Sequence, residues 1–145
     1  MNDKWDLRFL ELAHVIAKWS KDPSTQVGAV IVNDDRQIVS QGYNGLPSRV
    51  PDDPEILDNR FEKYKYIIHA ETNAILTANS SVKGCTLYTF PFLPCTNCAS
   101  MVIQAGIKRV VSFQCVDDRW KEGLVDSRHI FDIAGIEVVE LMIKW

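Results

Sequence analysis

The chain has 145 residues, 46% of them hydrophobic and 24% charged, and these values predict one domain, residues 1–145, with a single buried core. No stretch approaches the roughly 18 consecutive apolar residues of a membrane span, and residues 1–6 lack the layout of a secretory signal, so we expect a cytoplasmic protein with no membrane partner. The formal net charge of −3 disfavours nucleic acid as a partner, because polynucleotide binding usually needs a clustered positive surface.

The N-terminal part of the chain predicts a helix followed by a hairpin. Apolar residues at helical spacing over residues 5–20 predict an amphipathic helix, which ends before Pro23 because proline disfavours helical geometry in the preceding residue. Residues 27–32 form an apolar, β-branched run, which predicts a central strand covered on both faces. After the turn-forming residues 33–36, residues 37–41 predict a second strand that pairs with the first.

Sequence rich in glycine and proline follows this hairpin. The segment Gly-Tyr-Asn-Gly, residues 42–45, fits either an ordinary turn or a loop where the main chain approaches a ligand, because glycine permits conformations closed to other residues. Residues 46–59 contain three prolines and little periodicity, which predicts a long loop with a short helix near residues 54–60. A loop of this length is a candidate lid or effector-binding segment.

Helices and strands alternate in the C-terminal half. The apolar spacing predicts a helix that begins at His69 and packs one face on a sheet. The strand, helix, strand order that follows is typical of parallel neighbours. The predicted elements are a strand at 87–90, a helix from Cys95 to Gly106, a strand at 108–114, a helix at 126–134 and a strand at 137–143.

Two short segments carry the candidate chemistry: His-Ala-Glu, residues 69–71, and Pro-Cys-Thr-Asn-Cys, residues 94–98. Cys95 and Cys98 stand one helical turn apart, so both can bind the same ion, and a helix N-terminus favours their thiolate forms. One imidazole and two thiolates leave the fourth position of a tetrahedral zinc ion open, which distinguishes a catalytic from a structural site. Glu71 is then the candidate proton carrier.

The zinc interpretation has alternatives. A Cys-x-x-Cys pair also occurs in redox proteins, and a purely structural zinc is a further possibility. However, H-x-E followed by P-C-x-x-C is the signature of zinc-dependent nucleobase deaminases, in which His69, Cys95 and Cys98 are ligands and Glu71 is not. The two other cysteines lie in apolar, strand-like runs and are predicted to be small buried core residues.

Beyond these motifs the chain resembles the cytidine and deoxycytidylate deaminase family over nearly its whole length, and most of all the deoxycytidylate deaminases. The matching stretches are residues 20–29, 42–45, 69–76 and 103–108. The resemblance implies an α/β fold, a mixed five-stranded sheet between layers of helices, as in the three-layer fold of cytidine deaminases. It also implies one Zn²⁺ per chain and hydrolytic deamination of dCMP to dUMP and ammonia.

The same resemblance gives roles to individual residues. His69, Cys95 and Cys98 would hold the zinc. Glu71 would take a proton from the attacking water, protonate ring N3 of the base and later give a proton to the departing amine. Asn44 matches a family asparagine that contacts the nucleotide.

Regulation and assembly are also implied by the family. Its members are often hexamers that dCTP activates and dTTP inhibits, so we expect a homo-oligomer. If this chain shares that control, the effector contacts are expected at Tyr43, Gly45 and the proline-rich loop.

Two features depart from the family pattern. Residues 46–68 contain no further Cys or His with which several members bind a second, structural zinc. Residues 90–93 differ from the forms associated with dCMP, which leaves cytidine, cytosine or a tRNA adenosine as alternative substrates. A non-catalytic nucleotide-binding protein with a structural zinc is the alternative from another class. The candidates for a 5′-phosphate ligand are Arg49, Arg60, Lys65, Arg119 and Lys121.

Overall fold

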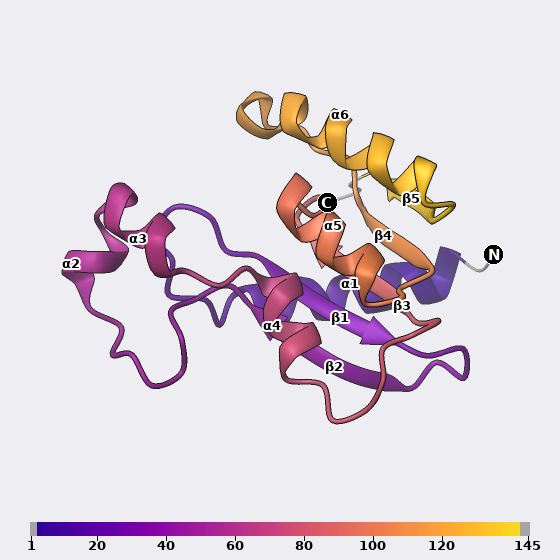
Figure 1. Ribbon diagram of the computed structural model, residues 1–145, viewed down its shortest axis with the longest axis horizontal. Coiled ribbons are helices and arrows are strands. Elements are labelled where there is room, and N and C mark those ends of the chain that lie inside the picture. The colour runs from indigo at the N-terminus through magenta and orange to yellow at the C-terminus, as the bar shows by residue number, and fades with distance from the viewer. Residues whose placement is uncertain (1–2, 143–145) are drawn as a thin grey trace.

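A computed structural model describes residues 3–142 of the chain, and Figure 1 shows its arrangement. A five-stranded sheet has helices on both of its faces, which confirms the predicted α/β fold. The strands are β1 (Gly28–Val32), β2 (Ile38–Tyr43), β3 (Thr86–Phe90), β4 (Arg109–Phe113) and β5 (Glu137–Leu141). The helices are α1 (Asp3–Ala17), α2 (Pro54–Leu57), α3 (Arg60–Tyr66), α4 (Ala70–Leu76), α5 (Thr96–Gln104) and α6 (Asp118–Ile133).

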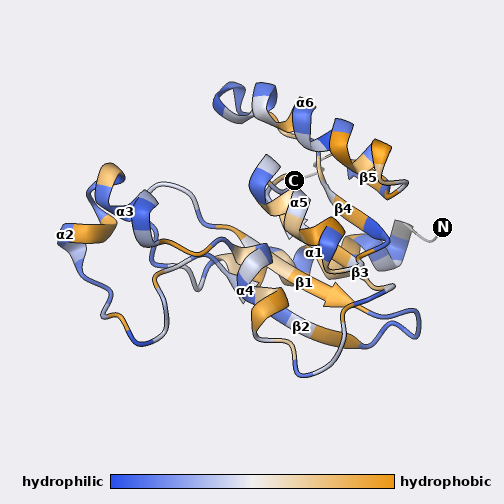
Figure 2. Cartoon of the chain, viewed as in Figure 1, coloured by the Kyte–Doolittle hydropathy of each residue, from blue (hydrophilic) through white to orange (hydrophobic). Residues whose placement is uncertain are grey.

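The sheet is mixed, with strand order β2-β1-β3-β4-β5. β1 is antiparallel to both β2 and β3, whereas β3, β4 and β5 run parallel. The two parallel connections pass through α5 and α6, so the strand, helix, strand prediction is confirmed. β1 is buried along its whole length and appears hydrophobic throughout in Figure 2, although the middle place in the sheet belongs to β3.

Two hydrophobic clusters make the fold a three-layer structure. Alternate residues of β1 point to opposite faces, because side chains alternate across a strand. Val30 and Val32 pack with Leu10 and Ala13 of α1 on one face. Ile31 belongs to the cluster on the other face, where α4, α5 and α6 cover the sheet. Each fully buried aliphatic side chain contributes roughly 1.5–3 kcal/mol to folding, so these two clusters dominate the stability.

Two glycines let helices approach the sheet closely. A Cβ at Gly28 would lie 2.0 Å from the Ala13 carbonyl oxygen of α1. A Cβ at Gly42 would lie 2.6 Å from the Ala74 nitrogen and 2.8 Å from the Ala70 oxygen of α4. Gly42 belongs to strand β2 rather than to a loop, so its physical role is to admit α4, the helix that carries the candidate site.

A buried polar cluster fastens α1 to strands β3 and β4 on the face of the sheet that α1 covers. Arg109 of β4 donates two hydrogen bonds to Asp6 of α1, at 2.9 and 2.7 Å, and a third to Glu137 of β5 at 2.6 Å. The Tyr88 hydroxyl donates to Asp6 at 2.8 Å. Burial, together with this bond to Asp6, raises the pKa of Tyr88 above its ordinary value. Asp6 is only 2% exposed, so these partners replace the water that its carboxylate loses on folding.

The other predicted elements differ in their limits. The first helix ends at Ala17, and α6 begins at Asp118, well before the predicted residue 126. The approach to His69 contains helix α3, which was not predicted, and α2 fills part of the helix expected near residues 54–60. Residue 143 of the last predicted strand lies outside the described residues. Within the described part, no helix has the length and apolar character needed to cross a membrane.

Candidate active site

His69 and Glu71 are placed by the start of helix α4. His69 is the N-cap residue, with extended backbone angles, and the segment before it is held by paired hydrogen bonds between Ile68 and Gly45 at 2.8 and 3.0 Å. Glu71 lies in the first turn and is only 4% exposed. Its carboxylate therefore stands beside the imidazole, inside the protein, as expected for residues on either side of a helix start.

The cysteines occupy the equivalent position on helix α5, directly after strand β3. Cys95 is the N-cap residue and Cys98 lies in the first turn. The Ala99 N–H donates to the Cys95 carbonyl at 2.7 Å, which fixes the cap. Pro94 precedes the cap by one residue instead of standing inside the first turn. The two helix N-termini thus bring three donor side chains together, and their partial positive charge favours thiolates.

The three donor atoms have the spacing of a metal site. His69 Nδ1 lies 3.2 Å from Cys98 Sγ and 3.5 Å from Cys95 Sγ, and all three ligand atoms lie within 4.8 Å of one another. Zn–N of about 2.0 Å and Zn–S of about 2.3 Å in a tetrahedron place nitrogen and sulfur about 3.5 Å apart. His69, Cys95 and Cys98 are therefore placed to bind one metal ion, and their donor types suit zinc.

The charges around these donors also fit a cation. Hydrogen bonds from the Cys98 thiol and the His69 ring lower the pKa of Cys95 to about 4. The pKa of Cys98 is raised by its bond to Cys95 and by burial. Burial raises the pKa of Glu71 as well, and its Oε1 has no hydrogen-bond partner among the residues that the structure describes. A buried carboxylate oxygen without a partner points to a ligand or substrate at this place.

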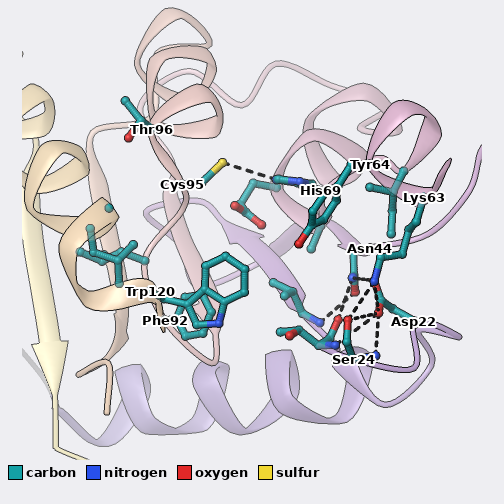
Figure 3. A pocket seen from close by; sticks show the side chains of 18 residues that line it. Asp22, Ser24, Asn44, Lys63, Tyr64, His69, Phe92, Cys95, Thr96 and Trp120 are labelled. Atoms are coloured by element: carbon teal, nitrogen blue, oxygen red, sulfur yellow. Dashed lines mark hydrogen bonds and ion pairs between the residues drawn. The ribbon is translucent and has the colours of Figure 1, made fainter. Parts of the chain in front are cut away.

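A cavity of about 150 Å³ opens beside these residues. Figure 3 shows His69 and Cys95 at one end, a polar group around Asp22 on one side, and the rings of Phe92 and Trp120 on the other. Nearly all the remaining lining is apolar, including residues of α3 and α6. The cavity has the shape and composition of a small-molecule site, with a few polar groups in an otherwise apolar wall.

A buried ion pair forms the polar side. Lys63 Nζ of α3 lies 3.0 Å from Asp22 Oδ1, and the two side chains are 4% and 5% exposed. Lys63 also donates to the Ser24 hydroxyl at 2.8 Å. Burial alone would raise the pKa of Asp22, but hydrogen bonds from Ser24, Lys63 and Thr25 outweigh it and hold that pKa below its ordinary value. Sequence reasoning missed this pair, because both residues lie in segments that resemble surface loops.

Asn44 belongs to the same polar side, and every atom of its amide group is engaged. Its Oδ1 accepts from the Val27 N–H at 2.9 Å, and its Nδ2 donates to the Thr25 carbonyl at 2.9 Å and to Asp22 at 3.3 Å. Asn44 lines the cavity and also shapes the loop that leads into β1. Asn44 therefore lies at the cavity wall and makes structural bonds of its own, and its contact with a nucleotide stays a prediction.

The aromatic side was also missed from the sequence. Phe92 and Trp120 pack with ring centroids 5.9 Å apart. Trp120 stands in the first turn of α6, whose N-cap Asp117 accepts a hydrogen bond from the Arg119 N–H at 2.9 Å. The acidic pair at 117–118 is an N-cap signal that identifies the true start of this helix.

The remaining candidates lie outside the cavity. Tyr43 ends strand β2, is 41% exposed, and meets the exposed ring of Trp19 edge-on at 6.2 Å. Gly45 is held by Ile68 and does not line the cavity. None of the five proposed phosphate ligands lines it either, although Arg119 borders an adjacent hollow.

Fold and site together define a class of protein: a three-layer α/β enzyme with three side chains placed to bind one metal ion beside a buried carboxylate. A sequence profile of the cytidine and deoxycytidylate deaminase zinc-binding region matches residues 3–114, and the chain belongs to this family. This confirms the resemblance drawn from the motifs.

Individual relatives cover nearly all of the chain. A deaminase from the luxG 3′ region of Aliivibrio fischeri is 45% identical over 144 residues, which span 97% of this chain and 96% of that protein. Human deoxycytidylate deaminase is 41% identical over 141 residues, covering 92% of this chain and 77% of its own length. A crystal structure of dCMP deaminase from the cyanophage S-TIM5 in complex with dCMP and dUMP has a TM-score of 0.77 at 26% identity, covering 97% and 99% of the two chains.

Proposed function

We propose that this chain catalyses the hydrolytic deamination of dCMP to dUMP and ammonia, with one Zn²⁺ per chain. The observation that carries the proposal is the buried Glu71 oxygen without a partner, beside three side chains spaced to bind one metal ion. The names of the human relative and of the cyanophage structure, with its dCMP and dUMP, support this choice of substrate.

His69, Cys95 and Cys98 would hold the metal. A zinc ion in such a site acts as a Lewis acid and makes hydroxide available near neutral pH. Glu71 would take a proton from the attacking water through its unpaired oxygen and pass it to N3 of the base. It would then take the second proton from the hydroxyl newly bonded to C4 and give it to the amine that leaves from C4. Water and dCMP are thereby converted to dUMP and ammonia, and Glu71 returns to its starting state.

The walls of the cavity would orient the base. The rings of Phe92 and Trp120 offer a flat apolar surface against which a pyrimidine can pack. On the opposite side, Asn44 Oδ1 has one protein donor and a second lone pair, which can accept from a sugar hydroxyl. Burial of the reacting groups excludes bulk water, which strengthens each of these polar contacts.

A non-phosphorylated substrate, deoxycytidine or cytidine, is the second candidate. The observation that favours it is that Lys63, the lysine that lines the cavity, is already paired with Asp22. Ammonia release should be measured with dCMP, CMP, deoxycytidine, cytosine and adenosine at equal concentrations. We expect the highest kcat/KM with dCMP; activity confined to a compound without phosphate contradicts the proposal.

Assembly, regulation and location are part of the same proposal. We propose a cytoplasmic homo-oligomer, a hexamer as is frequent in the family, that responds to dCTP as activator and dTTP as inhibitor. Exposed Tyr43, beside the exposed ring of Trp19, supports a contact surface near Gly45. Light scattering coupled to gel filtration gives the subunit number, and turnover at low dCMP with each triphosphate tests the response. A monomer that ignores both triphosphates contradicts this part.

A further inference from the structure

The catalytic cavity is a poor place for a phosphate group. Of its charged lining residues, Lys63 and Asp22 neutralise each other at 3.0 Å, while Glu71 remains. Lys63 is thus already engaged, and among the described residues the cavity lining contains no other lysine or arginine. A phosphate dianion in this low-dielectric space would lack a cation to balance its charge, so we expect its place outside the cavity.

A second hollow of about 410 Å³ adjoins the cavity. It lies between the end of α1, the loop that leads into β1, and the start of α6. Ser24, Thr25, Phe92 and Trp120 line both spaces, so the hollow is a direct neighbour of the catalytic cavity. Figure 3 labels Ser24, Phe92 and Trp120 of this shared lining, with Ser24 in the polar group around Asp22 and the two rings beside each other.

The hollow, unlike the catalytic cavity, is lined by more positive than negative side chains. Lys18 and Arg119 line it with one carboxylate, Asp117. Lys18 is exposed and has no salt-bridge partner within residues 3–142. His14 also borders the hollow, and burial together with the neighbouring Lys18 lowers its pKa, so it adds no charge at neutral pH. The side chains that line the hollow therefore carry one more positive than negative charge at neutral pH.

Arg119 is already oriented for an anion. Its Nε and Nη2 donate to Asp117 at 3.1 and 2.7 Å. Asp117 is itself fixed, because it caps α6. The guanidinium has five N–H donors in a rigid plane, so Nη1 keeps its donors for a ligand.

We propose that this hollow receives the 5′-phosphate of the nucleotide whose base lies in the catalytic cavity, with Lys18 and Arg119 as specificity-determining residues. The inference rests on the proposed function, because it assumes that a cytosine nucleotide is the substrate. Arg119 is one of the five candidate phosphate ligands predicted from the sequence. Lys18 was not among those five.

The test compares substrates with and without phosphate. Lys18→Gln and Arg119→Gln should each lower kcat/KM for dCMP by about 10- to 100-fold, the size expected for one charge-assisted hydrogen bond, and leave kcat/KM for deoxycytidine unchanged. Lys121→Gln is the matched control, because Lys121 also lies in α6 and pairs with Asp118 at 3.6 Å but does not line the hollow. Equal losses on both substrates, or no loss on dCMP, overturn the assignment.

Calorimetric measurement of ligand affinity for the zinc-loaded protein tests the phosphate site independently of the proposed deaminase activity. Wild type should bind dUMP more tightly than deoxyuridine, and both variants should remove most of that difference. Equal affinities for dUMP and deoxyuridine in wild type reject the hollow even if dCMP is deaminated. Conversely, a wild type that binds dUMP through Lys18 and Arg119 but releases no ammonia rejects the proposed function alone. Inorganic phosphate that binds as tightly as dUMP marks an unrelated anion site and also rejects the hollow.

Discussion

Replacing Lys63 by methionine should destabilise the protein more than any change at an exposed lysine. The ammonium group of Lys63 lies 3.0 Å from Asp22, and both side chains are almost fully buried. Methionine keeps much of the side-chain length but leaves Asp22 as a buried charge without its cation. Removing one partner of a buried ion pair costs about 3–5 kcal/mol, because the remaining charge has lost its solvation.

That cost is a large fraction of the free energy of unfolding of the whole domain. A domain of this type has a free energy of unfolding of about 5–15 kcal/mol, and a loss of 3–5 kcal/mol corresponds to a fall in Tm of roughly 6–20 °C. Urea unfolding followed by far-UV circular dichroism measures the change. Kinetics should show a raised KM as well, since the pair holds the loop before β1 against the cavity.

Lys65→Met is the matched control for this experiment. Lys65 lies on the same helix, α3, and pairs with Glu62 at the same 3.0 Å distance, but it is 47% exposed. Exposed pairs contribute about 0–1 kcal/mol, so its loss should be barely measurable. If Lys63→Met costs no more than Lys65→Met, the argument from burial is wrong.

Three further predictions concern pH and packing. The pKa of Asp22 is lower in the folded protein than in the unfolded chain, so its contribution to stability is present above the ordinary carboxyl pKa and is lost as pH falls through the folded value. In Asp22→Asn, the urea concentration at the unfolding midpoint should therefore change less with pH in this acid range. Gly42→Ala should lower both Tm and activity, because its Cβ meets the backbone of α4 at 2.6 Å, whereas Gly45→Ala, with no atom within 4 Å, should leave both unchanged. Asp6→Ala should cost about 3–5 kcal/mol in urea unfolding, since it leaves buried Arg109 with Glu137 as its one remaining partner in this cluster and removes the acceptor of Tyr88; a loss near 1 kcal/mol would contradict this expectation.

The metal ligands were predictable because the relevant pattern is local. Cys95 and Cys98 are one helical turn apart, and His69 directly precedes its helix, so spacing alone places each donor at a helix start. The order of the strands and of helices α1, α4, α5 and α6 was predictable for the same reason, since apolar periodicity marks these elements.

The walls of the cavity depend on long-range packing and were not predictable. Lys63 and Asp22 meet inside the protein only because α3 folds back over the loop before β1, and a lysine in a polar segment normally signals a surface. Gly42 was given a possible ligand role, whereas the structure requires it for contact with α4. The last helix was predicted to begin at residue 126 rather than at Asp118, because the charges around Trp120 hide the apolar spacing of α6.

We propose that Glu71 moves protons beside a zinc ion that His69, Cys95 and Cys98 hold. Zinc content and ammonia release from dCMP should be measured on the same samples of wild type and Glu71→Gln. We predict one zinc per chain in both proteins and a fall in kcat of about 10² to 10⁴-fold in the variant, the range for loss of a general acid–base group. A wild type without zinc, or a Glu71→Gln protein with full turnover, contradicts the account.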